Sequence, residues 1–222
     1  MRCIELKYSD IRGKEVLDSN GDKIGEVADW IFSCGENILD LRYIVLGGGR
    51  IEEFLESIGV RPDIDPVVRL ENVDSISDKV YLTVNRESLK NTIDPGVLAE
   101  TYITFSKLSD VKVIDTDGIK VGFVIDIWFD EDNVMWLVLG GGFFEELLER
   151  IKAQPDIDLL VPPHLVESID KSEIRLNISK FQLESTCEDE YKKLQRQLQG
   201  PEPHDDARYA QLRLGRASGG LT

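Results

Sequence analysis

Residues 18–29, Asp-Ser-Asn-Gly-Asp-Lys-Ile-Gly-Glu-Val-Ala-Asp, return as residues 115–126, Asp-Thr-Asp-Gly-Ile-Lys-Val-Gly-Phe-Val-Ile-Asp. Both stretches carry Asp, Gly, Gly and Asp at the same four positions, at a constant offset of 97 (115 − 18 = 97). Asn-Gly and Asp-Gly are strong hairpin-turn signals, and the alternating residues around them are typical of strands. A glycine inside the second strand marks a bulge or a sharp bend. The stretch therefore predicts a bent hairpin, made twice.

The repeat continues beyond the hairpin. Leu-Gly-Gly-Gly at residues 46–49 returns at residues 139–142, now at an offset of 93 (139 − 46 = 93), so the second copy is four residues shorter between the two motifs (97 − 93 = 4). Each glycine run follows a short apolar stretch rich in strand-forming residues. Each run then leads into apolar residues at the i, i+3, i+4, i+7 spacing of an amphipathic helix. These helix positions are Ile51, Phe54, Leu55 and Ile58, and Phe144, Leu147, Leu148 and Ile151.

A last strand, at residues 80–84 and again at residues 174–178, ends each copy. The chain is therefore expected to be mainly β, with two small barrels that each contain one short helix insert. We expect the first domain at residues 1–86, a linker at 87–102, the second domain at 103–182 and a C-terminal helix and tail at 183–222. Within the tail, residues 188–198 predict a helix, and residues 200–222 have the composition of a disordered segment.

Composition excludes several classes of function. The 222 residues carry a formal net charge of −16, and their Lys and Arg are evenly spread, so we expect no direct binding of nucleic acid. No apolar run approaches the length of a membrane span, and the N-terminus lacks the apolar segment of a signal peptide. Cys3, Cys34 and Cys187 are widely separated and form no C-x-x-C pair, which is typical of a reducing compartment. We therefore expect a cytoplasmic protein with no direct membrane insertion.

No motif carries a complete chemical site. The glycine runs lead into Glu-Glu pairs, at residues 52–53 and 145–146, which would repel a phosphate. The start of the hairpin, residues 18–22, is similar to a calcium loop but lacks the later bidentate glutamate. Asp29 and Asp126 recur without a His or Lys companion, which favours a structural or interfacial role over acid-base catalysis. We therefore expect no enzyme activity, no cofactor and no metal.

Candidate contact residues come from aromatic side chains, from differences between the copies and from the tail helix. The three tryptophans, Trp30, Trp128 and Trp136, are expected in the core, although Trp128 is also kept as an interface candidate. Phe143 is not needed by the helix stripe, so we expect it on an exposed face. It aligns with Arg50, as Phe123 aligns with Glu26. The candidate partner interface comprises Phe143, Phe123, Trp128, Arg50, Tyr191, Leu194 and Leu198.

The hairpin stretch of the first copy, residues 13–32, resembles the opening hairpin of the PRC-barrel family, and residues 113–129 resemble it again. The family includes the photosynthetic reaction centre H subunit and the ribosome-maturation factor RimM. The shared pattern is Asp-x-x-Gly-x-x-[Ile/Val]-Gly-x-Val-x-Asp, and the resemblance covers residues 5–85 and 103–180. It implies a small, strongly bent β-barrel in each copy and no common catalytic residues.

The chain shows neither the membrane helix of the H subunit nor the separate N-terminal domain of RimM. It is more similar to small archaeal PRC-barrel proteins, some of which act as adaptors in FtsZ-based cell division. This resemblance implies a non-enzymatic assembly adaptor that forms a homodimer or a higher assembly. Its partners would be a SepF-type membrane anchor or other PRC-barrel proteins, at the division site. The alternative is a RimM-like factor for ribosome maturation or RNA processing that binds a basic ribosomal protein.

Overall fold

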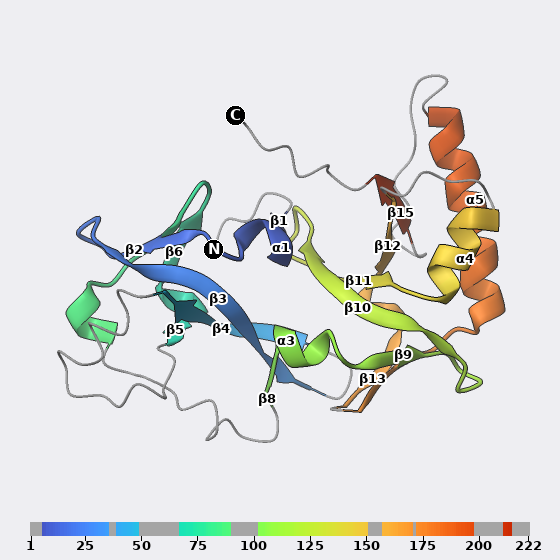
Figure 1. Cartoon of the computed structure of the whole chain (residues 1–222), viewed down its shortest axis with the longest axis horizontal. Coiled ribbons are helices and arrows are strands. Elements are labelled where there is room, and N and C mark those ends of the chain that lie inside the picture. Colours follow the sequence, from blue (N-terminus) through green and yellow to red (C-terminus); the bar gives the residue numbers. More distant parts are fainter. Residues whose placement is uncertain are drawn as a thin grey trace. The chain divides into compact units, whose positions relative to one another are not determined.

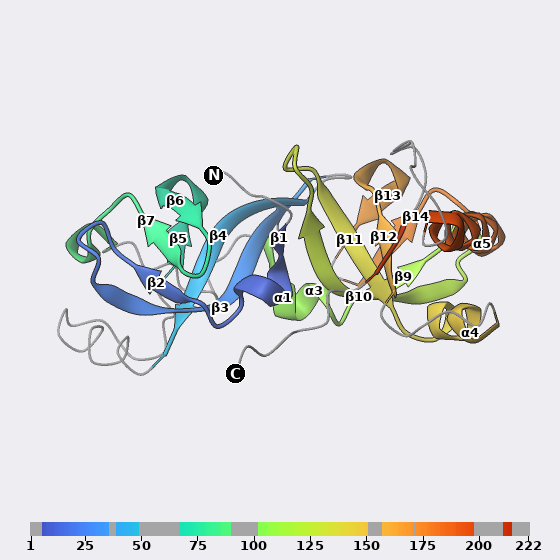
Figure 2. The ribbon, with the colours of Figure 1, turned by 90° about the horizontal axis from the view of Figure 1, so that it is seen from above.

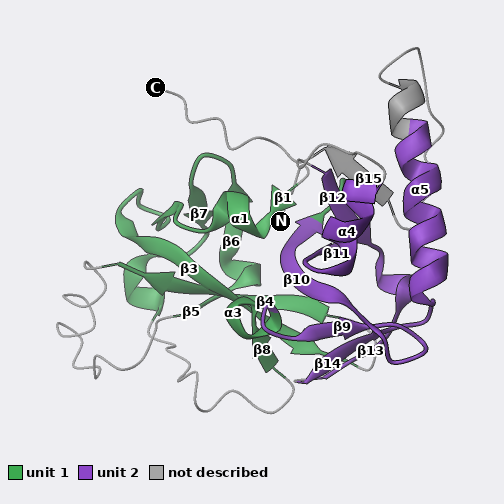
Figure 3. Cartoon of the chain, turned by 45° about the vertical axis from the view of Figure 1, so that its right-hand side comes forward, with its two compact units in different colours: residues 1–35, 39–108, 129–133 green, residues 36–38, 109–128, 134–222 purple. Residues whose placement is uncertain are grey.

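A computed structural model describes residues 6–35, 39–48, 67–89, 102–150, 157–170, 172–197 and 211–214. The helix expected at residues 51–58 lies outside these residues, as do Arg50 and Leu198. The chain divides into two compact units (Figure 3). Unit 1 comprises residues 1–35, 39–108 and 129–133, and unit 2 comprises residues 36–38, 109–128 and 134–222.

Unit 1 is mostly β-structure with short helical turns. Its elements are β1 (Leu6–Lys7), α1 (Tyr8–Ile11), β2 (Glu15–Leu17), β3 (Lys23–Cys34), β4 (Leu39–Gly47), β5 (Val67–Arg69), η1 (Leu70–Asn72), β6 (Val73–Ile76), β7 (Val80–Leu82), η2 (Arg86–Leu89), β8 (Tyr102–Thr104) and α3 (Phe105–Leu108). The strands follow the order β5-β4-β3-β2-β7-β6. Neighbours in this order are antiparallel except β2 and β7, which are parallel.

Unit 2 repeats this plan. Its elements are β9 (Lys112–Ile114), β10 (Lys120–Phe129, of which Phe129 belongs to unit 1), β11 (Met135–Gly140), α4 (Phe143–Arg150), β12 (Ile157–Val161), η4 (Pro163–Leu165), β13 (Val166–Ile169), β14 (Glu173–Leu176), α5 (Lys180–Gln197) and β15 (Gln211–Leu214). The order β12-β11-β10-β9-β14-β13 reproduces that of unit 1, and β9 and β14 are again the parallel pair. Figures 1 and 2 show β3 and β10 as the corresponding long, curved strands.

The predicted glycine bends are present in both hairpins. In unit 1 the register of β2 and β3 shifts by one residue, and the extra residue is Ile24, directly before Gly25. In unit 2 the register of β9 and β10 shifts in the same way at Val121, directly before Gly122. An extra residue in one strand of an antiparallel pair bends that strand and increases its twist. The expectation of a bent hairpin in each copy is therefore confirmed.

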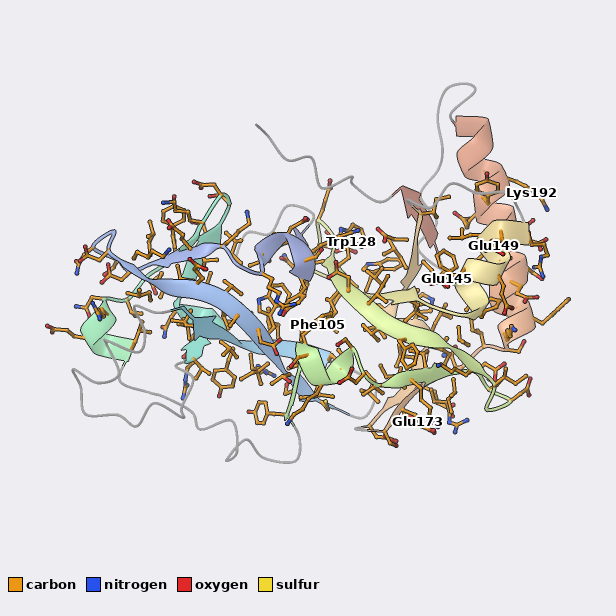
Figure 4. The ribbon with its side chains drawn as sticks, in the orientation of Figure 1. Phe105, Trp128, Glu145, Glu149, Glu173 and Lys192 are labelled. Carbon is orange, nitrogen blue, oxygen red and sulfur yellow. The ribbon has the colours of Figure 1, made fainter. Side chains whose placement is uncertain are left out.

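The core of unit 1 includes residues from the start of the second copy. β8 pairs with the end of β3, and Phe105 of α3 packs against Tyr8 of α1 with ring centroids 3.9 Å apart. Tyr8 in turn lies 5.1 Å from the fully buried Trp30. Figure 4 labels Phe105 within this group. The compact units therefore divide after Leu108, whereas the repeat in the sequence places residues from 103 onward in the second copy.

The C-terminal region differs from the expectation in two ways. The helix α5 begins at Lys180, eight residues before the predicted start, because the apolar residues Leu183 and Cys187 are fully buried. The expected disordered tail contains β15, which pairs antiparallel with β12. Four residues that alternate in polarity are too short a signal to distinguish a strand from an irregular segment by composition.

Candidate partner-binding surface

Two glycines bring β10 and β11 unusually close together. A Cβ atom at Gly122 would collide with the carbonyl oxygen of Gly140, so only glycine fits there. A Cβ atom at Gly140 would lie 2.8 Å from the side chain of Ile125. The side chain of Ile125 therefore lies over the backbone of β11 at Gly140, which has no side chain of its own.

The outer side of β10 is consequently apolar and accessible. Ile125 is 54% exposed, and Phe123, two residues earlier on the same side of the strand, is half-buried. The ammonium group of Lys120 lies 3.6 Å from the centroid of the Phe123 ring, which is a cation-π contact. We refer to Lys120, Phe123 and Ile125 as the β10 face. Neighbouring apolar side chains that stay accessible on one strand make the β10 face a candidate contact surface.

The first copy has a different surface at the same positions. At the offset of 97, Phe123 aligns with Glu26 and Ile125 aligns with Ala28. The amino group of Lys23, which aligns with Lys120, lies 2.8 Å from both Glu15 and Glu26. Two salt bridges lower the pKa of Glu15 to about 2, and the one to Lys23 contributes more than the one to Lys79. The first copy therefore has an ion-pair network where the second has the β10 face.

Charge reversal between the copies explains this difference. The position of Glu15 is taken by Lys112 in the second copy, and Lys112 forms a 3.0 Å salt bridge with Glu173 on β14. This salt bridge lowers the pKa of Glu173 (labelled in Figure 4) below its ordinary value. Lys120 consequently has no glutamate at either of the two positions that bind Lys23, and its amino group lies over an aromatic ring instead.

An acidic helix begins close to the β10 face. A Cβ atom at Gly141 would lie 3.6 Å from the Phe123 ring, and α4 begins two residues later. Glu145, Glu146 and Glu149 are all exposed on α4, and Figure 4 labels Glu145 and Glu149. The surroundings of the β10 face therefore favour partners that combine apolar and basic side chains.

The motif aspartates have a structural role that accounts for their recurrence. The Oδ1 atom of Asp18 accepts hydrogen bonds from the backbone N–H groups of Asn20 and Asp22, and its Oδ2 atom accepts one from Arg86. Burial alone would raise the pKa of Asp18, but the backbone donors, with Arg86 the largest contribution, lower it below its ordinary value. The carboxylate thus closes the turn and fixes it to the chain that follows β7.

Asp115 makes the same contacts in unit 2. It accepts hydrogen bonds from the N–H groups of Asp117 (2.9 Å), Ile119 (2.7 Å) and Lys180 (2.8 Å). Burial opposes ionisation here too, but these donors lower the pKa of Asp115 below its ordinary value. Both carboxylates are occupied by backbone groups, which supports the hairpin interpretation over the calcium loop.

The second aspartate of each motif also binds backbone groups. Asp29 accepts hydrogen bonds from its neighbour Trp30 (2.7 Å), from the Tyr8 hydroxyl (3.3 Å) and from the N–H group of Ser106 (3.3 Å). Asp126 is buried and accepts a hydrogen bond from Ile127 (2.8 Å). Through Ser106, Asp29 holds the start of α3 within unit 1. The structural interpretation of this residue is therefore supported by its contacts.

Two of the candidate interface residues lie in the core. Phe143 is only 6% exposed, and the amino group of Lys180 lies 4.9 Å from its ring centroid, so the expectation that it lies on an exposed face is wrong. Phe143 and Phe144 are both buried because α4 begins at Phe143. Trp128 is 8% exposed and packs in a cluster with Trp136, Val138 and Leu160.

The remaining candidates are placed differently. Phe123 lies on the β10 face, and Tyr191 is half-buried on α5. The side chain of Leu194 lies outside the part of the chain that the structure describes, as do Arg50 and Leu198. Ile125 was missed by the sequence analysis. The signal that could have found it was present, since the offset of 97 aligns this large apolar residue with Ala28.

Within the described residues, no three His, Cys, Asp or Glu side chains are grouped so that they could hold a metal ion. Cys187 is fully buried. Burial is the main cause that raises its pKa to about 12, and the negative charges of Glu190, Glu184 and Glu188 add to it. The thiol is therefore unreactive as a nucleophile. None of the helices in this part of the chain has both the length and the apolar composition to span a bilayer.

Comparison with known proteins identifies the repeated unit. The PRC-barrel domain matches residues 4–89 and again residues 100–183. An alignment 187 residues long, which covers 78% of this chain and 20% of the other protein, is 22% identical to the transcriptional regulator RFX1 of Candida albicans. The chain thus spans about a fifth of the regulator's length, and the likeness carries no function to this chain. The two domain matches coincide with the two copies of the hairpin motif.

Proposed function

Because the chain belongs to the PRC-barrel family, with two copies of the domain, we propose that it is a non-enzymatic assembly adaptor that binds protein partners through the β10 face. Tandem PRC-barrel domains fit a protein-interaction module. The observation that carries the proposal is the exposure of Ile125 beside Phe123 on β10. A large aliphatic side chain in this position gains free energy when a partner covers it, at about 25 cal/mol per Å² of buried apolar surface.

The comparison between the copies supports this assignment. Both copies fold the same hairpin around the same aspartate, so the hairpin itself accounts for the shared residues. Folding does not require Phe123 and Ile125, because the first copy folds with Glu26 and Ala28 at these positions. Side chains that differ between copies without a folding requirement are the best candidates for function.

The family resemblance indicates which partners to test first. We propose a SepF-type membrane anchor or another PRC-barrel protein as the partner, and a homodimer or higher assembly of the chain itself. In this proposal the protein acts in the cytoplasm and is recruited to the site of cell division. The cysteine usage supports the location, and the resemblance to archaeal division adaptors supports the role.

A second candidate function is favoured by charge. The net charge of −16 and the exposed glutamates of α4 would attract a basic protein. A RimM-like factor that binds a basic ribosomal protein would use these groups. Its binding would weaken strongly with added salt, whereas contact through the β10 face, which is largely apolar, would weaken less.

The test replaces the β10 face with the residues of the first copy, in the double variant Phe123→Glu/Ile125→Ala. Binding of the purified chain to a SepF-type anchor and to a second PRC-barrel protein is measured by biolayer interferometry, and self-association by light scattering. Phe181→Glu is the matched control, because Phe181 is 75% exposed on α5 and aligns with Glu87 at the offset of the last strand (174 − 80 = 94; 181 − 87 = 94). We expect the double variant to lose affinity about ten-fold or more and the control to retain it.

The urea midpoint confirms that the double variant remains folded. Unchanged affinity and self-association of the double variant would overturn the assignment of the β10 face. Binding of ribosomal proteins alone, lost at raised salt, would replace the proposed function by the alternative.

A further inference from the structure

The edge of β12 in unit 2 is covered by a strand that does not belong to the repeated domain. β15 pairs with residues 157–160 of β12, whereas the domain match ends at residue 183. The strand β15 also contacts α5. The domain itself therefore leaves this edge available, and a segment added to the domain occupies it (Figure 1).

The register of this pairing is chemically specific. Leu212 and Leu214 lie opposite Leu159 and Ile157, which are both buried. Arg213 lies opposite Asp158 on the neighbouring position of the ladder. Opposite charges and apolar pairs that face each other across two strands both stabilise the pairing. The edge therefore selects an extended segment with apolar residues two positions apart and a base between them.

The sequence of the first copy differs at the position that corresponds to this edge. The residue that aligns with Leu159 at the offset of 93 is Pro66. Proline has no N–H group to donate to a neighbouring strand, so it is found at edges that are not extended. The two copies thus differ at this edge as they differ on the β10 face.

We propose that the edge of β12 is a docking site for an extended segment of a partner protein, and that β15 is a built-in competitor for it. The partner segment has leucine-like residues at alternate positions and an Arg or Lys between them. It adds to the sheet as an antiparallel strand next to β12, and its base pairs with Asp158. Strand addition of this kind derives affinity from main-chain hydrogen bonds and specificity from alternate side chains.

The tail controls access to this site through its covalent attachment. Residues 198–210 join α5 to β15, so β15 competes at an effective concentration in the millimolar range. A partner segment with a dissociation constant of tens of micromolar would therefore bind the intact chain roughly ten-fold or more weakly than a chain without β15. Release of the tail opens the site.

The probe for this proposal is a fluorescent peptide with the sequence of residues 207–218, and the readout is fluorescence anisotropy. We compare the full chain with a chain that ends at Gly200 and with the full-length variant Leu212→Asp/Leu214→Asp. The second variant keeps the tail and guards against a folding defect of the truncated chain. Both altered chains are expected to bind the peptide about ten-fold or more tightly than the full chain.

Two further comparisons test the chemistry. Asp158→Lys is expected to weaken binding about two- to five-fold, and a peptide with Arg213→Glu should restore it. A peptide with Leu212→Pro should not bind. The variant Phe123→Glu/Ile125→Ala, with the tail removed, should bind the peptide normally, because this site does not depend on the β10 face.

Several results would overturn the proposal. One is that the peptide of residues 207–218 shows no saturable binding to either altered chain. Another is that the intact chain and the altered chains bind this peptide with equal affinity, and a third is that the Leu212→Pro peptide binds as well as the unmodified peptide. A full chain that is a dimer at micromolar concentration and becomes a monomer when residues 201–222 are removed would also overturn it, because β15 would then occupy the partner copy.

Discussion

Asp115 is expected to be among the most sensitive positions for the stability of unit 2. Its carboxylate accepts three backbone hydrogen bonds, at 2.9, 2.7 and 2.8 Å, which connect the hairpin turn to the start of α5. The variant Asp115→Asn keeps the shape but replaces one acceptor oxygen by an NH₂ group that faces a backbone donor. Hydrogen bonds to a charged group contribute about 1.5–3 kcal/mol each, and they are not additive. We expect a loss of about 2–4 kcal/mol in the free energy of unfolding.

This loss of unfolding free energy is measured by urea unfolding, monitored by tryptophan fluorescence, since Trp128 and Trp136 lie in the same unit as Asp115. With a slope of about 2 kcal/mol per molar urea, the midpoint should fall by about 1–2 M. Asp110→Asn is the control, because Asp110 is exposed, and its effect should stay within about 0.5 kcal/mol. Equal midpoints for the two variants would refute the structural role of Asp115.

The pH dependence gives a second test of the same residue. The pKa of Asp115 is lower in the folded chain than its ordinary value, so the folded state favours the ionised carboxylate. Its stabilising contribution is therefore present above the ordinary pKa and is lost as the pH falls through the lowered value. The difference between the wild-type chain and Asp115→Asn should shrink below about pH 4. A difference that stays constant or grows on acidification would contradict this account.

Three other perturbations follow from individual contacts. Gly122→Ala should lower the free energy of unfolding by about 3 kcal/mol, because the added Cβ would collide with the carbonyl oxygen of Gly140. Gly21→Ala should lower it by only about 1–2 kcal/mol, because there only the φ of +85° is unfavourable. Equal urea midpoints of the two variants would be inconsistent with the close approach of Gly122 to Gly140. A carboxyl NMR titration should give Glu15 a pKa of about 2 that rises in Lys79→Met, and an ordinary value in the native chain would exclude the salt bridges. In a Cys3→Ala/Cys34→Ala chain, Cys187 should stay unreactive at pH 8 until the protein unfolds, because the thiol is buried and its pKa is about 12. Rapid thiol labelling of the native chain would show that α5 is not packed as described.

Local patterns predicted the parts of the fold that depend on neighbouring residues. The turns before Ile24 and Val121, with their bulges, follow from Asn-Gly and Asp-Gly and from the glycine that ends each bulge. The helix α4 follows from the spacing of its apolar residues. These features are set within a few residues of each other, and no information about distant contacts is needed.

Features that depend on distant contacts were not predicted. The sequence around Phe105 does not show that this segment completes the core of unit 1 beside Tyr8. Phe143 was left over from the helix stripe, yet the position at which α4 starts buries it. The strand β15 is defined by its partner β12 rather than by its own four residues. In each of these cases the decisive contact lies far away in the sequence.

The β10 face was half predicted. Phe123 was identified as a difference between the copies, but the accessibility of Ile125 depends on Gly140, where any other residue would meet the Ile125 side chain. That contact lies between two strands and is visible only in the folded chain. The mismatch in the sequence located the surface, and the close approach of the strands shows why it is open.

Photo-crosslinking from the β10 face tests the central claim most directly. The photoreactive residue p-benzoylphenylalanine is placed at position 125 in one chain and at the matched, exposed position 28 in another. The account predicts crosslinks from position 125 to a discrete protein partner, absent at position 28 and lost when Phe123→Glu is added. Equal crosslinking at both positions, or crosslinks from position 125 that persist in the Phe123→Glu chain, would contradict it.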